Sequence, residues 1–159
     1  MTDRLEVQLF GSATFSLNGR PVKSLPTRVS QALLIYLLHQ KNPIERERLI
    51  DMFYQASTPK QAAANFRSTL SRLRKELASF LLITNRTVGI APEANIWIDA
   101  KAFAQEMAEN EWQKALPLYQ GDFLAGFFLR DAPEFENWAL VERERLRLLA
   151  VKGLQIKAA

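Results

Sequence analysis

One segment of this 159-residue sequence combines helical spacing with the side chains that bind nucleic acids. Over residues 60–79, apolar side chains recur every three or four positions, as one buried helix face requires; they are Ala62, Phe66, Leu70, Leu73 and Leu77. A helix turns about 100° per residue, so the opposite face is polar and basic; it carries Ser68, Ser71, Arg72 and Lys75, flanked by Asn65, Arg67 and Arg74. Arginine pairs with guanine, asparagine with adenine, and serine with a base or a phosphate. Segment 60–79 is therefore a candidate DNA-reading helix.

The charge of this segment supports that hypothesis and leaves one alternative. Four basic and no acidic residues lie between positions 65 and 75. Lys75 and the flanking arginines suit phosphate contacts, which give affinity and register but no sequence information. The alternative is a solvated surface helix, because arginine and lysine are good helix formers in any protein.

The elements around the segment have the order of a winged helix-turn-helix. Alternating apolar residues and an Asn18-Gly19 turn predict a small antiparallel sheet over residues 5–22. Two helices, 30–38 and 45–54, precede the candidate reading helix, and a hairpin follows it at 81–90 with Arg86 in its turn. In such a fold the third helix lies in the major groove. Arg86 would then touch the minor groove or a phosphate, unless it is merely an exposed turn residue.

From Asp99 onward the pattern is only helical. Asp99 is placed to cap a helix that carries Phe103 and Met107. A second helix is expected from Glu111 to Tyr119, and a long one from about residue 133 to 157. The predicted fold class is thus an α+β winged helix over residues 1–98, followed by an all-α segment over 99–159.

The charge distribution fits two partners of different kinds. Residues 1–98 hold 13 Lys and Arg against 7 Asp and Glu, a balance of +6, whereas residues 99–142 hold 3 against 9, a balance of −6. A basic part suggests a polyanion partner and an acidic part a protein partner.

The composition provides few of the residue types that enzymes use for catalysis. The chain has no cysteine and one histidine, so a thiolate metal site, a cysteine nucleophile and a disulfide framework are excluded. Glu134 and Glu136 lie at an expected helix start, where acids favour the positive dipole end. His39, the three tryptophans and Asp122 are expected to be structural. We therefore expect no enzyme, no cofactor and no metal. No apolar run reaches membrane-spanning length and the N-terminus has no signal-peptide pattern, so we expect a cytoplasmic, nucleoid-associated protein.

Several motifs carry a resemblance to a known family. Residues 1–98 resemble the OmpR-type winged-helix DNA-binding domain. Nearly the whole chain resembles the Streptomyces antibiotic regulatory protein (SARP) type of activator, which joins that domain to a bacterial transcriptional activation domain. The motifs in the first part are LEVQLFG (5–11), NGRPV (18–22), LPTRVSQALL (25–34), IERERL (44–49), ANFR (64–67) and SRLR (71–74). Those in the second part are LYQGDFLAGF (118–127), PEFENW (133–138) and ERERL (142–146).

The resemblance implies roles for individual residues. Asn65, Ser68 and Arg72 match positions that touch bases. The positions expected to hold the DNA backbone are Thr69, Arg74 and Lys75, together with Arg28, Arg46 and Arg48 near the starts of the first two helices. The loop before the third helix corresponds to one that OmpR-type activators present to RNA polymerase; here it offers Gln55, Ser57, Thr58 and Lys60. Such relatives bind direct repeats side by side, which implies at least two protomers per operator and a possible homodimer on DNA.

The sequence also departs from the family pattern. Glu45 stands where a serine cap is usual, Tyr54-Gln55 replaces Trp-Pro, and Val88-Gly89 lacks the usual wing tyrosine. The activation domain of relatives is longer, with tetratricopeptide-like packing, whereas here about 61 residues remain after residue 98. The resemblance implies a DNA-binding transcriptional activator. The alternative is a winged-helix assembly module with little DNA affinity.

Overall fold

The computed structural model describes residues 2–159, which divide into two compact units. The first unit contains the chain up to Pro21 together with Asn95–Phe127 and Asn137–Ala159; the second contains Val22–Ala94 and Phe128–Glu136. The packing units therefore cut across the expected division at residue 98, because the N-terminal strands pack with residues that follow position 94. That division, as a functional boundary, stays a prediction.

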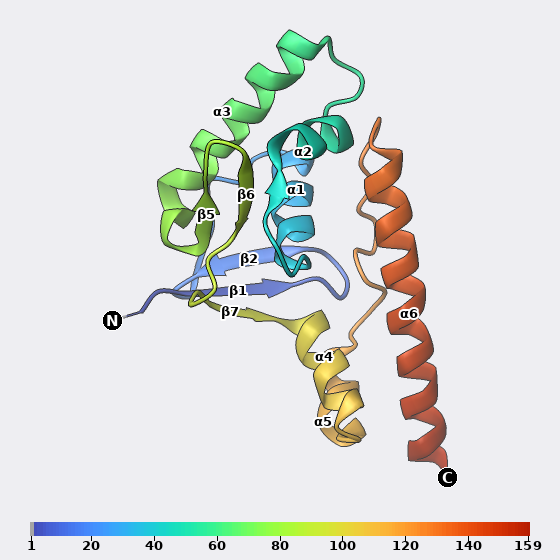
Figure 1. Cartoon of the computed structure of the whole chain (residues 1–159). Helices are drawn as coiled ribbons and strands as arrows, with labels where there is room; N and C mark the ends of the chain where they lie inside the picture. Colours follow the sequence, from blue (N-terminus) through green and yellow to red (C-terminus); the bar gives the residue numbers. More distant parts are fainter. Residues whose placement is uncertain (1) are drawn as a thin grey trace. The chain divides into compact units, whose positions relative to one another are not determined.

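The first unit is built on a four-stranded sheet of order β3-β2-β1-β7 (Figure 1). Its strands are β1 (Arg4–Gln8), β2 (Thr14–Leu17), β3 (Arg20–Pro21) and β7 (Asn95–Ile98). The predicted small antiparallel sheet is confirmed: β1 pairs with β2, with Leu5 opposite Leu17, and Asn18 and Gly19, both at positive φ, make the turn between β2 and β3. Strand β7 pairs in parallel with β1, which the sequence pattern did not predict. Alternate residues of β1 are buried, so one face of the sheet forms part of this unit's core.

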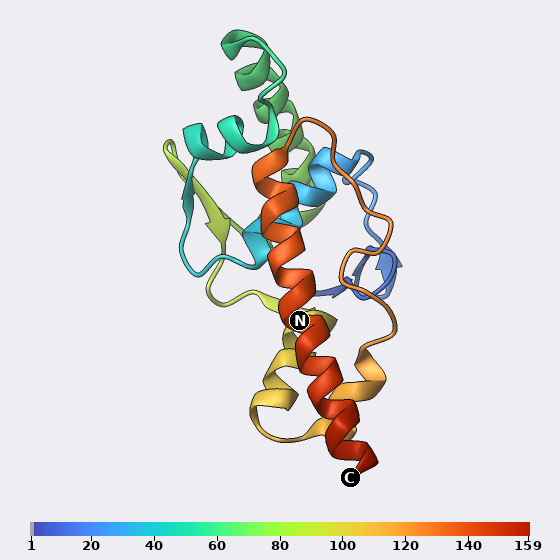
Figure 2. The same ribbon diagram turned by 90° about the vertical axis from the view of Figure 1, so that its right-hand side faces the viewer.

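Three helices complete the first unit, and one differs from expectation. They are α4 (Asp99–Ala108), α5 (Trp112–Ala115) and the part of α6 (Pro133–Ala158) after residue 136. In place of an α-helix from 111 to 119, α5 ends at Ala115 and a 3-10 turn follows over Leu116–Leu118. Pro117 explains the break, because it lacks the N–H that a continuing α-helix needs. Figure 2 shows α4 and α5 beside the C-terminal part of α6, and Gly153 approaches Met107 and Leu116 there.

The second unit contains the predicted three helices and hairpin. Its elements are α1 (Arg28–Leu38), β4 (Ile44–Glu45), α2 (Arg46–Phe53), α3 (Pro59–Leu77), η1 (Ala78–Phe80), β5 (Leu81–Ile83) and β6 (Thr87–Ile90). The three strands form a small sheet of order β4-β6-β5. Gly89 is required in it, since a Cβ at this position would lie 2.9 Å from the Cα of Pro43.

The starts of the three helices are built differently. Thr27 begins α1 with a capping box shared with Ser30. Thr58 caps α3 by accepting from the backbone N–H of Gln61, and Pro59 occupies the first turn, where its missing N–H costs nothing. Glu45 precedes α2 without any side-chain cap, as expected where glutamate replaces serine.

No helix within residues 2–159 combines the length and apolar character that a membrane span needs.

Candidate nucleic-acid interface

Helix α3 has the two faces that its sequence predicts. The apolar stripe is buried in the second unit: Ala62, Phe66, Leu70, Leu73 and Leu77 are all less than 5% exposed. The side chains predicted to read or hold DNA are mostly exposed, namely Arg67, Ser68, Ser71, Arg72, Arg74 and Lys75. Asn65 is half-buried, and its side-chain oxygen accepts a hydrogen bond from Gln61 Nε2 at 3.0 Å. Apolar packing thus fixes which face of α3 is offered to solvent.

Thr69 does not belong to the exposed surface. It is 9% exposed, and its hydroxyl lies 2.6 Å from the hydroxyl of Tyr54. Burial raises the pKa of Tyr54, an effect that the hydrogen bond to Thr69 and the nearby charge of Arg72 oppose. The expected backbone contact by Thr69 is therefore corrected to a structural role: this hydroxyl joins the end of α2 to α3.

Three arginines surround a small hollow between α2 and α3. Arg46, Arg67 and Arg74 line it with Ser71 and the apolar Leu70, and its volume is about 300 Å³. Arginine donates in a rigid fork that matches phosphate oxygens, and a serine hydroxyl can add a further donor. The hollow thus brings together residues from two helices. Arg67 and Arg74 were predicted to lie beside the reading face of α3 and Ser71 on that face, whereas Arg46 comes from α2. It has the chemistry of a phosphate site.

The hairpin turn is tied to the start of α2. Arg46 Nε donates to the Thr84 carbonyl at 3.1 Å, and the Arg46 backbone N–H donates to the Arg86 carbonyl at 2.7 Å. Within the turn, Thr84 Oγ1 accepts from the backbone N–H groups of Arg86 and Thr87. The Arg86 side chain is exposed at this ordered turn. This exposed position is compatible with the predicted contact of Arg86 with the DNA minor groove or a phosphate.

Arg28 and Arg48 contact a segment of their own unit instead of joining this surface. Arg28 Nη1 donates to the Phe128 carbonyl at 3.1 Å. Arg48 forms an ion pair with Glu134 at 2.5 Å, which raises the pKa of the arginine. Both guanidinium groups are thus engaged with residues 128–136, and the phosphate contacts expected of Arg28 and Arg48 stay predictions.

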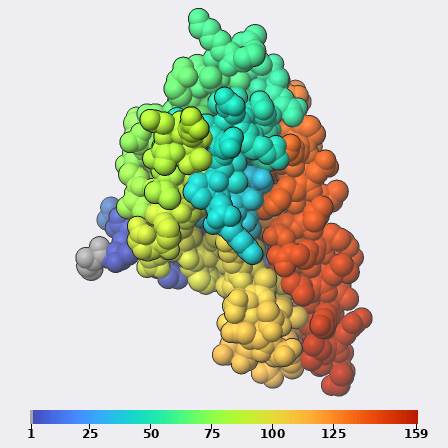
Figure 3. Space-filling model, in the orientation of Figure 1, coloured from blue at the N-terminus to red at the C-terminus, as the bar shows by residue number. Residues whose placement is uncertain are grey.

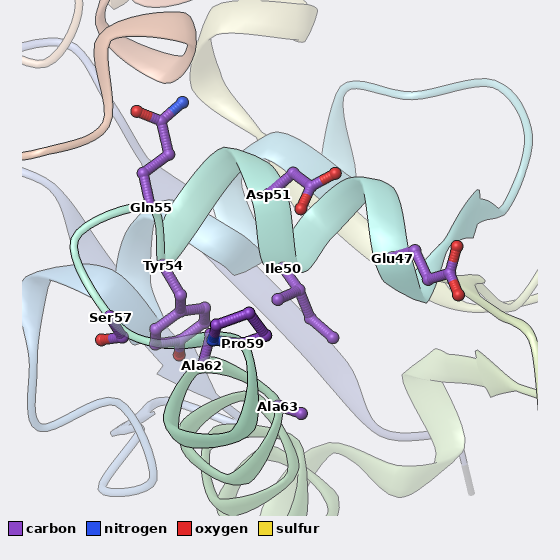
Figure 4. Close-up of a pocket in the computed structure, with 9 residues that line it drawn as sticks. All are labelled: Glu47, Ile50, Asp51, Tyr54, Gln55, Ser57, Pro59, Ala62 and Ala63. Carbon is purple, nitrogen blue, oxygen red and sulfur yellow. The ribbon is translucent and has the colours of Figure 1, made fainter.

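A groove separates α2 from the first turns of α3 (Figure 4). Figure 4 shows Ile50, Tyr54 and Pro59 in the space between the two helices, whereas the Gln55 side chain points away from α3. Two acids of α2 also line the groove, Glu47 and Asp51, and its volume is about 770 Å³. The groove therefore combines apolar side chains with negative charge.

The four residues expected to face RNA polymerase lie at this end of α3. Gln55 and Ser57 line the groove, and Thr58 and Lys60 follow at the start of the helix. Gln55, Thr58 and Lys60 are exposed, and Ser57 is half-buried. The loop is thus accessible within its unit.

Sequence reasoning missed two features of this region. The position of Arg46 between the α3 arginines depends on how α2 packs, and no sequence spacing reports that. The inward direction of Thr69 was detectable, because a residue three positions after Phe66 lies within about 60° of the buried stripe. Among residues 2–159 no cluster of three or more His, Cys, Asp or Glu side chains is arranged to hold a metal.

Comparison with known proteins supports the fold. The chain is similar to EmbR from Mycobacterium tuberculosis, solved in complex with a low-affinity phosphopeptide, with 23% identity and a TM-score of 0.66. The match covers 92% of this chain and 44% of that one, so the chain spans less than half of the EmbR chain. No protein-family model matches, and no curated protein matches significantly. The similarity supports a mixed α/β fold like that of EmbR.

Proposed function

We propose that this chain is a sequence-specific double-stranded DNA-binding transcriptional regulator of the SARP type. The observation that carries the proposal is the exposed face of α3, where Arg67, Arg72, Arg74 and Lys75 stand without an acid between positions 65 and 75. In the proposed complex α3 enters the major groove, which admits one helix.

The reading and holding roles divide along α3. Asn65, Ser68 and Arg72 would contact base edges, and the arginine fork would favour guanine. The hollow of Arg46, Arg67, Ser71 and Arg74 would hold a backbone phosphate, and Lys75 and Arg86 would add further phosphate contacts.

We further propose that the chain acts as an activator. Residues 55–60 would contact RNA polymerase, and residues 99–159 would form the beginning of a helical, tetratricopeptide-like activation domain that contacts protein. Two or more protomers would bind direct repeats, and the protein would be cytoplasmic and associated with the nucleoid. The proposed role requires no catalysis and no cofactor.

DNA binding would be tested by fluorescence anisotropy with duplexes enriched by selection from a random pool, over a salt series. A protein that neutralises several phosphates loses affinity steeply, with a slope of log affinity against log salt near −0.9 per phosphate. We expect Arg72→Ala to lose preference for the enriched duplex by roughly tenfold or more, because a bidentate base contact discriminates by that factor. Arg74→Ala is expected to weaken binding to all duplexes and to reduce the slope by about one.

Arg130→Ala is the matched control, since Arg130 is an exposed arginine of the same unit outside α3. It should leave both preference and slope nearly unchanged. Steep salt dependence without any preference would reject sequence reading by α3. Flat or absent binding at low salt would reject the DNA-binding proposal in favour of a winged-helix module for protein assembly.

A further inference from the structure

A pair of hydroxyl groups joins the end of α2 to the middle of α3. The Tyr54 hydroxyl lies 2.6 Å from the Thr69 hydroxyl, and the Thr69 side chain is buried. The Tyr54 ring also packs edge-on against the Phe66 ring, with 6.4 Å between the ring centroids. Figure 4 shows Tyr54 reaching from the end of α2 towards α3. One apolar and one polar contact therefore fix the Tyr54 side chain against this helix.

Thr69 lies on α3 between the buried stripe and side chains proposed to read bases. At about 100° per residue it is about 60° from Phe66, on the same side of the helix as Asn65 and Arg72. Asn65 precedes Thr69 by four positions and Arg72 follows it by three, so both are its neighbours on the helix surface. The charge of Arg72 is also close enough to Tyr54 to oppose the rise in the tyrosine pKa that burial causes. The hydroxyl pair is therefore adjacent to the proposed reading residues.

The hydrogen bond adds a restraint that apolar packing does not provide. Figure 3 shows α3, coloured green, along the surface of the second unit. The apolar stripe holds this helix by contacts that have no preferred direction, whereas a hydrogen bond requires a definite distance and angle. A side chain that reads a base must be held to within about 0.5 Å of its productive position. The hydroxyl pair supplies a directional restraint at the part of α3 from which Arg72 projects.

We propose that Tyr54 is a positioning residue for sequence reading: through Thr69 it holds the segment of α3 from which Arg72 reaches its base. This inference rests on the proposed function of the chain. Tyr54 touches no DNA in this role, so its hydroxyl contributes to the choice of sequence and not to the general affinity for the phosphate backbone. Specificity at the base pair read by Arg72 then depends on a bond between two helices as well as on the arginine itself.

Fluorescence anisotropy with the enriched duplex, and with duplexes that each carry one changed base pair, tests this role. The base pair read by Arg72 is the one whose change no longer weakens binding by Arg72→Ala. At this base pair Tyr54→Phe, which removes only the hydroxyl, should lose about threefold in preference, since one hydrogen bond contributes a factor of roughly two to ten. The slope of log affinity against log salt should not change, because no phosphate contact is lost.

Variants of Thr69 test the same bond from the other helix. Thr69→Val replaces the hydroxyl by a methyl group and should cause the same loss of preference, whereas Thr69→Ser keeps a hydroxyl and should retain it. The double variant Tyr54→Phe/Thr69→Val should lose no more than either single variant, because both remove one bond. In the Arg72→Ala protein, Tyr54→Phe should have no further effect at that base pair.

Tyr119→Phe is the matched control. It removes a tyrosine hydroxyl that donates to Asp122 Oδ1 at 3.2 Å in the first unit, away from α3 in the sequence and in a different packing unit. Preference and slope should both be unchanged. Circular dichroism verifies that each variant is folded, and preference is a ratio of two affinities of one protein, so a small unfolded fraction cancels from it.

The outcomes separate the positioning role from the proposed function. If the wild type showed no preference, or Arg72→Ala kept all of it, sequence reading by α3 would fail and the positioning role with it. If Arg72→Ala lost preference while Tyr54→Phe and Thr69→Val kept it, only the positioning role would be overturned. An equal loss at every base pair, or a further loss in the Arg72→Ala protein, would also overturn it, because the hydroxyl pair would then not act through Arg72.

Discussion

The Asp99 carboxylate joins parts of the first unit that are far apart in the sequence. It is 5% exposed and accepts hydrogen bonds from the backbone N–H groups of Leu9 at 2.8 Å, Phe10 at 3.1 Å and Ala100 at 2.7 Å. The sequence predicted only a helix cap here. Asp99 is instead the first residue of α4, whose N-cap is Ile98 without a side-chain cap, and the Asp99 carboxylate binds the chain just after β1.

Asp99 should make stability depend on pH. Burial raises its pKa above the ordinary value of 3.8, although its hydrogen bonds oppose the shift. The folded state then binds the proton more tightly than the unfolded state. The group's contribution to stability is fully present below the unfolded pKa, about 3.9, and is lost as pH rises through the folded pKa.

The comparison with Asp99→Asn isolates this effect, because asparagine does not titrate. We expect the free energy of unfolding of the wild type, relative to Asp99→Asn, to fall as pH rises from about 4 towards 7. Urea denaturation at several pH values measures it. Asp131→Asn, at an exposed position, serves as the control. A relative gain with rising pH would mean that the hydrogen bonds outweigh burial.

The exposure of the α3 arginines could be predicted from the sequence because it depends on a single helix. The exposed positions of Arg67, Arg72 and Arg74 follow from the apolar spacing of α3 alone. The phosphate contact expected of Arg48 stays a prediction, and in this structure Arg48 pairs with Glu134, 86 positions away. No local pattern reports a partner at that separation.

At the scale of elements, α2 begins without a side-chain cap. Its N-cap is Glu45, whose backbone already has the extended conformation typical of that position. Glu45→Ser should therefore supply the missing hydrogen bond to a free N–H in the first turn. We expect the free energy of unfolding to rise by about 0.5–1 kcal/mol, measured by urea denaturation.

Thr58→Ser is a suitable control, because α3 is already capped there and serine preserves the hydroxyl. It should change stability by much less. If Glu45→Ser brought no gain, the pairing of Glu45 with Thr87 in the β4–β6 ladder would be fixing its side chain away from the helix.

Elements with their own periodicity were predictable, and those defined by a distant partner were not. The three helices of the second unit, the 81–90 hairpin and the N-terminal hairpin all follow from local patterns. Strand β4 has only two residues, and the pairing of β7 with β1 depends on a strand about 90 positions away. Neither leaves a local signal.

At the scale of the whole molecule, the compact units are not continuous pieces of sequence. The first unit joins three segments, and the segment after α5 reaches back to the end of β1. Phe10 forms a bridge with Phe123, and the Leu124 N–H donates to the Leu9 carbonyl at 2.7 Å. Leu9, Phe10 and Phe123 are all at most 6% exposed.

These contacts between distant segments limit where the chain can be truncated. A fragment that stops at residue 98 would keep all the elements predicted to form a winged helix but lose Asp99 and Phe123, which contact Leu9 and Phe10. We expect such a fragment to aggregate on expression, and hydrogen exchange at residues 5–10 to be much faster than in the whole chain. A soluble fragment with protected amides there would show that the sheet is stable alone. The shortest useful piece for crystallisation or binding work is therefore set by the segment around Phe123, well past the end of the β5–β6 hairpin.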